Sequence, residues 1–336
     1  MPPVTSTGDL QGKTVLVTGG TGSFGTAFVK ELLANHDPAA IRVYSRDELK
    51  QHELERKLGG DGRLRYLLGD VRDVNRLKQA TRGVDVIVHA AALKQVVACE
   101  YNPFEAVQTN VIGAENVVTA AIENRVPRTL SLSTDKAVNP VNLYGATKLC
   151  AEKIVTQGNS YASAQGDARF SSVRYGNVVG SRGSVVPLFK AQAQDGVFTI
   201  TDEAMTRFWI TLEQAVNFVI DCLRRMEGGE VFIPKIPSMR VIDITQALAA
   251  QAERRIIGIR PGEKIHEILL TSEESRHAGS FDGFYAIYPS FPFWRSDDYP
   301  RGKELTPGFS YTSDNNDAWL TAGDIREMVS QIAPAT

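Results

Sequence analysis

The fold is indicated by Lys13-Thr-Val-Leu-Val-Thr18 and by the loop that follows it directly, Gly19-Gly-Thr-Gly-Ser-Phe-Gly25. The first run is short, apolar and β-branched, as in a buried parallel strand. The glycines at 19, 22 and 25 stand where this strand passes into the helical pattern of residues 26–35. Glycines let the backbone approach a pyrophosphate, and the start of a helix supplies N–H donors. The stretch therefore predicts a dinucleotide-binding strand–helix unit, although a glycine-rich loop alone could be a flexible turn.

The end of the next predicted strand, residues 41–44, bears on which dinucleotide would bind. This strand runs into Ser45-Arg46-Asp47, and Lys50 follows one helical turn later. An acid about 20 residues past the glycines usually binds a ribose 2′-hydroxyl. Serine, arginine and lysine suit a 2′-phosphate better, so the sequence favours NADP. Asp47 remains the competing NAD-type acid.

Strands and helices alternate over the first 175 residues or so of the chain. Asp70 could meet the adenine edge of a cofactor, and the small residues Ala90, Ala91 and Ala92 leave room for it. The long segment from Pro103 to Asn124 has a helical apolar stripe that includes Phe104 and Val107. Further predicted strands are residues 65–68, 84–89, 129–133 and 170–175. This alternation predicts an α/β fold with a doubly wound parallel (Rossmann) sheet and its site at the carboxyl ends of the strands.

The second half of the chain differs in character. Gly- and Pro-punctuated loops alternate there with shorter helical patterns. We expect a flexible tail at 1–11, a cofactor-binding domain at 12–180 that also takes part of 208–235, and a smaller, loop-rich substrate-binding domain over 181–336. Arg182, Arg207 and Arg260 stand near loop turns, where they could hold a diphosphate.

Composition limits the function further. The chain has 336 residues, 43% of them hydrophobic, and a net charge of −2, which gives no long-range attraction for nucleic acid or an anionic membrane. Its three cysteines and five histidines show no metal-binding spacing, so we expect no metal. The N-terminus lacks a secretory pattern, and no apolar run approaches the roughly 18 residues of a membrane span. The odd, scattered cysteines favour a reducing compartment, so we expect a cytoplasmic protein.

The chemistry points to the stretch from Ser133 to Lys148. Tyr144 and Lys148 are four residues apart, so a helix beginning after Pro140 would place both on one face. A neighbouring ammonium lowers the pKa of a phenol, which would make Tyr144 usable as a base. A lone pair of this spacing is often an ordinary surface pair, but Asp135 and Lys136 stand just upstream. Together the four residues could support more than one proton transfer.

These residues resemble the extended short-chain dehydrogenase/reductase family, which shares the three glycines and the Tyr144/Lys148 pair. More narrowly, the chain is similar to the inverting UDP-N-acetylglucosamine 4,6-dehydratases that begin pseudaminic acid synthesis. Related membrane-bound dehydratases carry Met in place of Tyr144, so the tyrosine favours the soluble inverting branch. The likeness runs over nearly the whole length and is carried by residues 44–50, 89–94, 133–148, 174–187, 205–210, 234–239 and 313–316.

The resemblance implies a redox-neutral dehydration with NADP. Tyr144 would take the proton of the C4 hydroxyl, Lys136 the proton of C5, and Asp135 would protonate the departing C6 hydroxyl. Lys136 must be neutral part of the time, so we expect a partly desolvated site to depress its pKa. The implied substrate is UDP-N-acetylglucosamine or a close nucleotide sugar, and the implied assembly is a homo-oligomer, a dimer or larger.

The motifs and the resemblance together predict three groups of site residues. The predicted catalytic residues are Thr134, Asp135, Lys136, Tyr144 and Lys148. The predicted cofactor contacts are Gly19, Thr21, Gly22, Ser23, Phe24, Gly25, Ser45, Arg46, Asp47, Glu48, Leu49, Lys50, Asp70, Val71, Ala90, Ala91, Ala92, Tyr144, Lys148 and Val178. The predicted substrate contacts are Lys94, Asn177, Arg182, Thr206, Arg260 and Glu263. Two alternatives stay open: a sugar-nucleotide epimerase or ketoreductase of the same fold, and a non-catalytic NADP-binding module.

Overall fold

The structure is a computed structural model that describes residues 10–162, 168–181, 185–291, 294 and 299–330. Most of the predicted N-terminal tail, residues 1–9, lies outside the described residues. The predicted substrate contact Arg182 also lies outside them.

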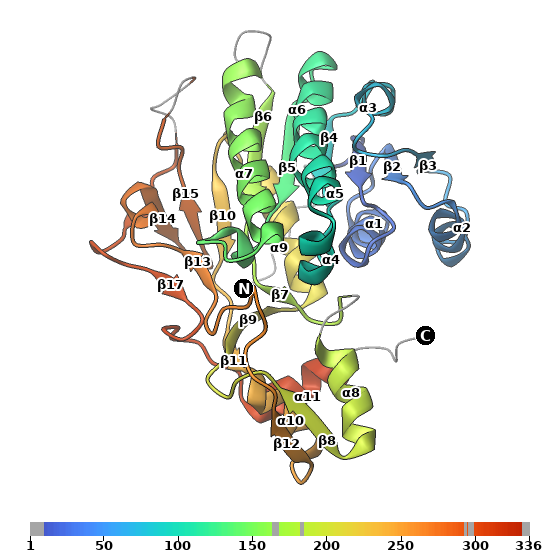
Figure 1. Cartoon of the computed structure of the whole chain (residues 1–336). Helices are drawn as coiled ribbons and strands as arrows, with labels where there is room; N and C mark the ends of the chain where they lie inside the picture. Colours follow the sequence, from blue (N-terminus) through green and yellow to red (C-terminus); the bar gives the residue numbers. More distant parts are fainter. Residues whose placement is uncertain (1–9, 163–167, 182–184, 292–293, 295–298, 331–336) are drawn as a thin grey trace.

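A 10-stranded sheet with the order β16-β14-β15-β10-β6-β5-β4-β1-β2-β3 forms the centre of the molecule (Figure 1). The seven strands from β10 to β3 are parallel, and β15, β14 and β16 extend the sheet in antiparallel fashion. Every predicted strand is present, so the predicted doubly wound α/β fold is confirmed. The strands are β1 Thr14–Thr18, β2 Ala40–Ser45, β3 Leu64–Leu68, β4 Val86–His89, β5 Arg128–Leu132, β6 Arg169–Val173, β10 Val231–Pro234, β14 Ala278–Phe281, β15 Phe284–Ile287 and β16 Lys303–Glu304.

The residues that point to either face of the central strands are apolar. Helices therefore cover both faces of this sheet. On one face α1 and α9 pack together over Val15 and Val17; on the other, α3, α6 and α7 pack over Leu16 and Ile87. The helices are α1 Ser23–Asn35, α2 Glu48–Lys57, α3 Val74–Ala80, α4 Val96–Tyr101, α5 Pro103–Val107, α6 Gly113–Glu123, α7 Leu143–Ala162, α8 Val185–Asp195, α9 Leu212–Arg225, α10 Val241–Ala249 and α11 Ala322–Ser330, with short 3-10 turns η2 Asp135–Ala137 and η3 Glu274–His277.

The long helical segment predicted from Pro103 to Asn124 is interrupted. A π-helical turn, η1 Gln108–Ile112, separates α5 from α6. The wider turn rotates the helix face that precedes it relative to the face that follows. The placement of Phe104 and Val107 in a buried stripe was therefore wrong: Phe104 is 83% exposed and Val107 is 37% exposed.

A second hydrophobic core lies in the part of the chain after β6. It gathers Phe198, Trp209 and Met239 under α8, α10 and α11, which lie below the main sheet in Figure 1. Three small sheets accompany this core: β7 Asn177–Val178, β9 Thr206–Ile210 and β11 Ser238–Arg240; β8 Val197–Ile200 and β12 Glu253–Ile256; β13 Ile268–Leu270 and β17 Tyr311–Thr312. β10 and the strands β14 to β16 belong to the main sheet. The predicted domain division remains a prediction.

Candidate active site

The loop between β1 and α1 forms a tight backbone cradle. Gly19 has a φ of +66°, and a Cβ placed on it would lie 2.9 Å from the Ala91 backbone. A Cβ on Gly25 would lie 2.5 Å from Gly20 Cα. The N-cap of α1 is Gly22, which has no side chain to cap the helix, and no acidic residue stands in the first turn. The N–H groups and positive dipole end of α1 fit the diphosphate of a dinucleotide.

The residues after β2 lie at the edge of this cradle. Asp47 caps α2, because its carboxylate accepts a hydrogen bond from Lys50 N at 3.0 Å and pairs with Lys50 Nζ at 2.6 Å. Arg46 is half exposed and lies 3.6 Å from Asp70, which is also paired with Arg72. The buried hydroxyl of Ser45 accepts a hydrogen bond from Gln51.

The remaining predicted cofactor contacts lie around the same strand ends. Ala90, Ala91 and Ala92 directly follow β4 and are partly buried. Val71 is buried, and Val178 lies in β7. Thr21, Ser23 and Phe24 belong to the loop and the first turn of α1, whereas Glu48 and Leu49 begin α2.

Four of the five predicted catalytic residues lie together in a polar row, and Lys148 is outside it. Thr134 Oγ1 donates to Asp135 Oδ1 at 2.9 Å, and Lys136 Nζ lies 3.0 Å from the same oxygen. Tyr144, on the first turn of α7, lies close enough to Thr134 for the threonine hydroxyl to lower the pKa of the phenol. The row exists because β5 ends just before η2, and α7 then returns across it. A phenol, a hydroxyl, a carboxyl group and an amine thus follow one another at the end of a central strand.

The expected effect of Lys148 on Tyr144 is wrong. Burial raises the pKa of Tyr144 to about 12, and the opposing effects come from Lys136 and the hydrogen bond of Thr134. The Lys148 ammonium instead donates to the Leu132 carbonyl at 2.6 Å. Burial lowers the pKa of Lys148 to about 8, although Glu152 opposes this shift. Helical spacing put Tyr144 and Lys148 on one helix, but the tertiary structure determines which charge acts on the phenol.

The expected depression of the Lys136 pKa is also wrong. Burial does lower it, but the neighbouring carboxylates of Asp135 and Glu267 together raise the pKa of Lys136 above its ordinary value. Burial in turn raises the pKa of Asp135, against the influence of Lys136. A raised pKa makes a carboxyl group hold its proton more firmly, which suits an acid.

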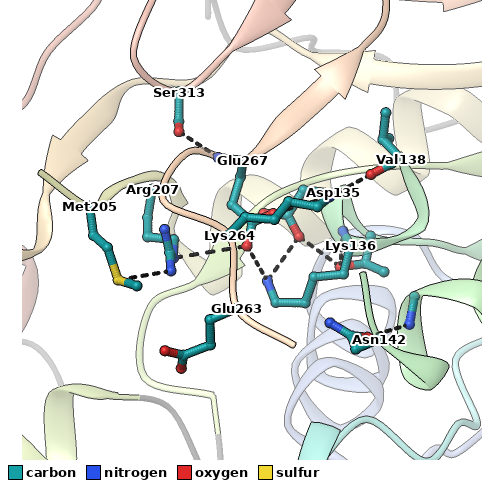
Figure 2. A network of polar contacts seen from close by, with 12 residues as sticks. Asp135, Lys136, Val138, Asn142, Met205, Arg207, Glu263, Lys264, Glu267 and Ser313 are labelled. Carbon is teal, nitrogen blue, oxygen red and sulfur yellow. Dashed lines mark hydrogen bonds and ion pairs between the residues drawn. The ribbon is translucent and has the colours of Figure 1, made fainter. Parts of the chain in front are cut away.

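Figure 2 shows the charged cluster around Lys136, part of which sequence reasoning missed. Glu267, buried just before β13, lies 3.4 Å from Lys136 Nζ and 3.9 Å from Arg207 Nε. Lys264 Nζ lies 3.8 Å from the other oxygen of Glu267. Glu267 and Lys264 carried no motif signal, since a single acid and a single lysine in a loop resemble any surface pair.

The predicted substrate contacts are not all equally available. Arg260 pairs with Glu263, and Lys94 is exposed in the segment that leads into α4. The hydroxyl of Thr206 is buried, 2.6 Å from Ser313 Oγ and 2.9 Å from His266 Nδ1. This arrangement favours a supporting role for Thr206.

Several buried side-chain oxygens of the predicted site residues lack a hydrogen-bond partner. Asp135 Oδ2, Asn177 Oδ1 and Glu263 Oε2 have no hydrogen-bond partner among the described residues. Buried polar atoms are usually paired, so these oxygens suit a bound polar molecule such as a sugar. No group of His, Cys, Asp and Glu in the described ranges is arranged to hold a metal ion. No helix described by the structure is long and apolar enough to span a membrane.

Comparisons with known proteins show the family of this chain. The family described as "Polysaccharide biosynthesis protein" matches residues 15–289. A protein of Campylobacter jejuni subsp. jejuni serotype O:2, named UDP-N-acetylglucosamine 4,6-dehydratase (inverting), is 50% identical over 327 residues, covering 95% of this chain and 97% of that protein. The chain belongs to this polysaccharide biosynthesis family. The resemblance to inverting dehydratases that the sequence indicated is thereby confirmed.

Two further members of the comparison show the breadth of the likeness. The X-ray structure of Pen from Bacillus thuringiensis is 37% identical, with a TM-score of 0.87, and covers 96% of this chain and 98% of that chain. A protein of Rickettsia felis named UDP-glucose 4-epimerase is 43% identical over 283 residues, covering 82% of each protein. Dehydratase and epimerase names thus both occur among the relatives of this family member.

Proposed function

We propose that this protein catalyses the NADP-dependent dehydration of UDP-N-acetylglucosamine to a UDP-2-acetamido-2,6-dideoxy-hexos-4-ulose with inversion at C5. The observation that carries the proposal is the row Tyr144–Thr134–Asp135–Lys136 beside the glycine cradle. This row offers separate groups for oxidation at C4 and for loss of water across C5 and C6. The Campylobacter relative, named for this reaction, supports the choice of substrate.

The backbone cradle and the residues after β2 would hold the cofactor. A bound nicotinamide dinucleotide supplies a hydride acceptor for C4 and a hydride donor for C6, so no external reductant is consumed. The use of Asp47 as the cap of α2 and the partner of Lys50 supports Arg46 as the 2′-phosphate ligand. NADP is therefore preferred to NAD in this proposal.

Tyr144 would take the proton of the C4 hydroxyl. Lys136 and Thr134 both lower the pKa of its phenol against the effect of burial. The phenol would accept the proton of the C4 hydroxyl while the C4–H bond is broken. The resulting C4 ketone acidifies the neighbouring C5–H bond.

Asp135 and Lys136 would then remove water. At rest they form an ion pair at 3.0 Å, and transfer of one proton from Lys136 to Asp135 gives a neutral amine and a carboxylic acid. The amine takes the C5 proton, and the acid gives its proton to the C6 hydroxyl, which leaves as water. The raised pKa of buried Asp135 favours this transfer, whereas the raised pKa of Lys136 opposes it, so the neutral pair is the minor form. The reactive form is made within the pair.

Inversion requires that the proton returning to C5 arrives on the face opposite to the one it left. Once C6 has been reduced, a protonated group on that opposite face delivers the proton. Deuterium from the solvent would therefore be incorporated at C5 during turnover.

An epimerase is the second candidate, favoured by the Rickettsia relative named UDP-glucose 4-epimerase. Epimerisation at C4 needs Tyr144 but gives Asp135 and Lys136 no role. A non-catalytic NADP-binding module would need none of these four residues.

One experiment separates these functions. The protein is incubated with UDP-N-acetylglucosamine and catalytic NADP in deuterated water and followed by NMR. The proposal requires loss of water, deuterium at C5 and no net formation of NADPH. A C4 epimer with unchanged C6 identifies an epimerase, whereas stoichiometric NADPH or no turnover contradicts the dehydratase.

The setting of the enzyme belongs to the same proposal. The product would enter pseudaminic acid synthesis in the cytoplasm, and the protein would act as a homo-oligomer, a dimer or larger. Light scattering coupled to size-exclusion chromatography measures the assembly directly.

A further inference from the structure

Glu267 is fixed at the site from a distant part of the chain. Its side chain is 3% exposed. Its backbone N–H donates to Ser313 Oγ at 2.9 Å, and its carbonyl accepts from Ser313 N at 2.8 Å. Ser313 Oγ is itself 2.6 Å from the hydroxyl of Thr206. The backbone of Glu267 is thus fixed by Ser313, and its buried carboxylate starts from this fixed point.

Its charge faces the catalytic pair. Within reach of the carboxylate are Lys136 on η2 at 3.4 Å, Arg207 on β9 at 3.9 Å and Lys264 of its own loop at 3.8 Å. Asp135 is the other anion of the cluster, 3.0 Å from Lys136. The Lys136 amine therefore lies between two carboxylates, one from each half of the chain (Figure 2).

A purely structural ion pair would be the simpler explanation. Moving a charged group out of water costs free energy. The attraction of a carboxylate to three cations offsets the desolvation cost of these charges. Yet Glu267 approaches Lys136 more closely than it approaches Arg207 or Lys264. Its Oε2 also has no hydrogen-bond partner among the described residues. A carboxylate retained only for stability would be expected to satisfy both oxygens.

We propose that Glu267 is a positioning residue for water elimination, holding the Lys136 amine against Asp135 at the end of the row that begins at Tyr144. This inference rests on the proposed function and adds a residue to it. Glu267 neither takes nor gives a proton to the sugar. It fixes where the amine stands, and its negative charge favours retention of the one proton that Asp135 and Lys136 share.

The electrostatic consequence has a definite sign. The Glu267 carboxylate raises the pKa of Asp135, where burial is the larger cause, and also raises the pKa of Lys136 against the effect of burial. Removing this charge lowers the pKa of both groups. In the variant, Asp135 loses its proton at lower pH and Lys136 becomes neutral at lower pH. Both limbs of a bell-shaped pH profile therefore move in the same direction.

The test compares Glu267→Gln with the wild-type holoenzyme. The amide keeps the size of the side chain but removes its charge. We expect kcat for dehydration and the rate of C5 deuterium exchange to fall about tenfold or more. KM should change little, and both limbs of the kcat profile should move toward lower pH. Glu267→Asp, which restores the charge, should return the limbs toward the wild-type positions even if the rate stays low.

A matched control is Glu230→Gln. Glu230 is equally buried, but its carboxylate accepts hydrogen bonds from Ser171 and from the backbone near Gly228, at the start of β10. This variant should lower the melting temperature without moving either pH limb. A fall in kcat of Glu267→Gln with both limbs in place would reduce Glu267 to a structural role, and unchanged kcat would overturn the proposal.

A second measurement does not depend on the reaction. Lys136 is 26% exposed, so acetic anhydride can label its amine, and mass spectrometry gives the labelling rate at each pH. In Glu267→Gln, labelling of Lys136 should begin at lower pH than in the wild type. If the wild type makes no dehydrated product, the proposed function fails. An unshifted labelling curve contradicts the inference about Glu267 itself.

Discussion

Gly145 of α7 lies directly against the backbone carbonyl of Lys136: a Cβ built on the glycine would stand 2.0 Å from that oxygen. Tyr144 and Lys136 approach each other because α7 passes so close to η2 at this point. The backbone around Lys136 is therefore held by the helix that carries the phenol. Any side chain at position 145 would push the two apart.

Gly145→Ala should accordingly destabilise the protein, although alanine ordinarily favours a helix. Overpacking against backbone costs about 1–3 kcal/mol. We expect dehydration to fall more than the melting temperature suggests, because Lys136 is displaced from Asp135. Gly323→Ala in α11 is the control: its nearest neighbour, Thr321 Oγ1, would be 3.5 Å away, so stability should stay equal or rise. Thermal melts and initial rates of both variants check this, and normal activity of Gly145→Ala would contradict it.

Variants that lack one of the two bases should be blocked at different steps of the reaction. Tyr144→Phe should block oxidation itself, leaving no 4-keto sugar and no exchange at C5. Lys136→Ala should permit oxidation but not elimination, so a 4-keto sugar that retains its C6 hydroxyl, or enzyme-bound NADPH, should accumulate. A positioned base contributes about 10²–10⁴-fold, so both losses should be plain in NMR and absorbance assays. Normal product from Lys136→Ala at a wild-type rate would show that Lys136 is only structural.

Arg46 should determine the preference for NADP over NAD. The half-exposed guanidinium stands at the end of β2, and Asp47 is engaged as the cap of α2. Loss of charge-assisted bonds to a phosphate should weaken NADP binding in Arg46→Ala by roughly 10- to 100-fold, with little effect on NAD. Fluorescence titration gives both dissociation constants. Arg56→Ala, which removes the same charge at the exposed end of α2, should change neither; equal wild-type affinities would instead indicate that Asp47 acts as an NAD-type acid.

His89 should make the fold sensitive to mild acid. Burial lowers the pKa of His89 to about 3, and its ring is 2.7 Å from the hydroxyl of Thr18. The unfolded chain binds a proton near pH 6.5 and the folded chain does not. The contribution of His89 to the free energy of unfolding is therefore complete above about pH 6.5. It decreases as the pH falls toward 3, by up to about 1.4 kcal/mol per pH unit.

Denaturant unfolding at several pH values measures this slope. His89→Gln should remove the contribution, so the free energy of unfolding should depend less steeply on pH between 6.5 and 4. The exposed His52→Gln should leave the slope unchanged. Parallel curves for the wild type and His89→Gln would show that His89 is protonated in the folded protein.

The central sheet and the main catalytic stretch were predictable because their signals are local. A short β-branched run, the glycines at 19, 22 and 25, and a four-residue spacing between Tyr144 and Lys148 each depend on neighbouring residues alone. Side chains repeat their direction every two residues in a strand and about every 3.6 residues in a helix. The apolar pattern of the sequence therefore shows these periods directly.

The tertiary structure alone decided the charge environment of the site. Glu267 lies 131 positions from Lys136 in the chain, and Ser313 fixes it from farther still. No sequence period connects residues so distant. A pKa depends on every buried charge and dipole nearby, so Tyr144 and Lys136 shift opposite to expectation once Asp135, Glu267 and burial are in place. Likewise, one π-helical turn exposed Phe104, because a single wider turn changes which face of the helix meets the core.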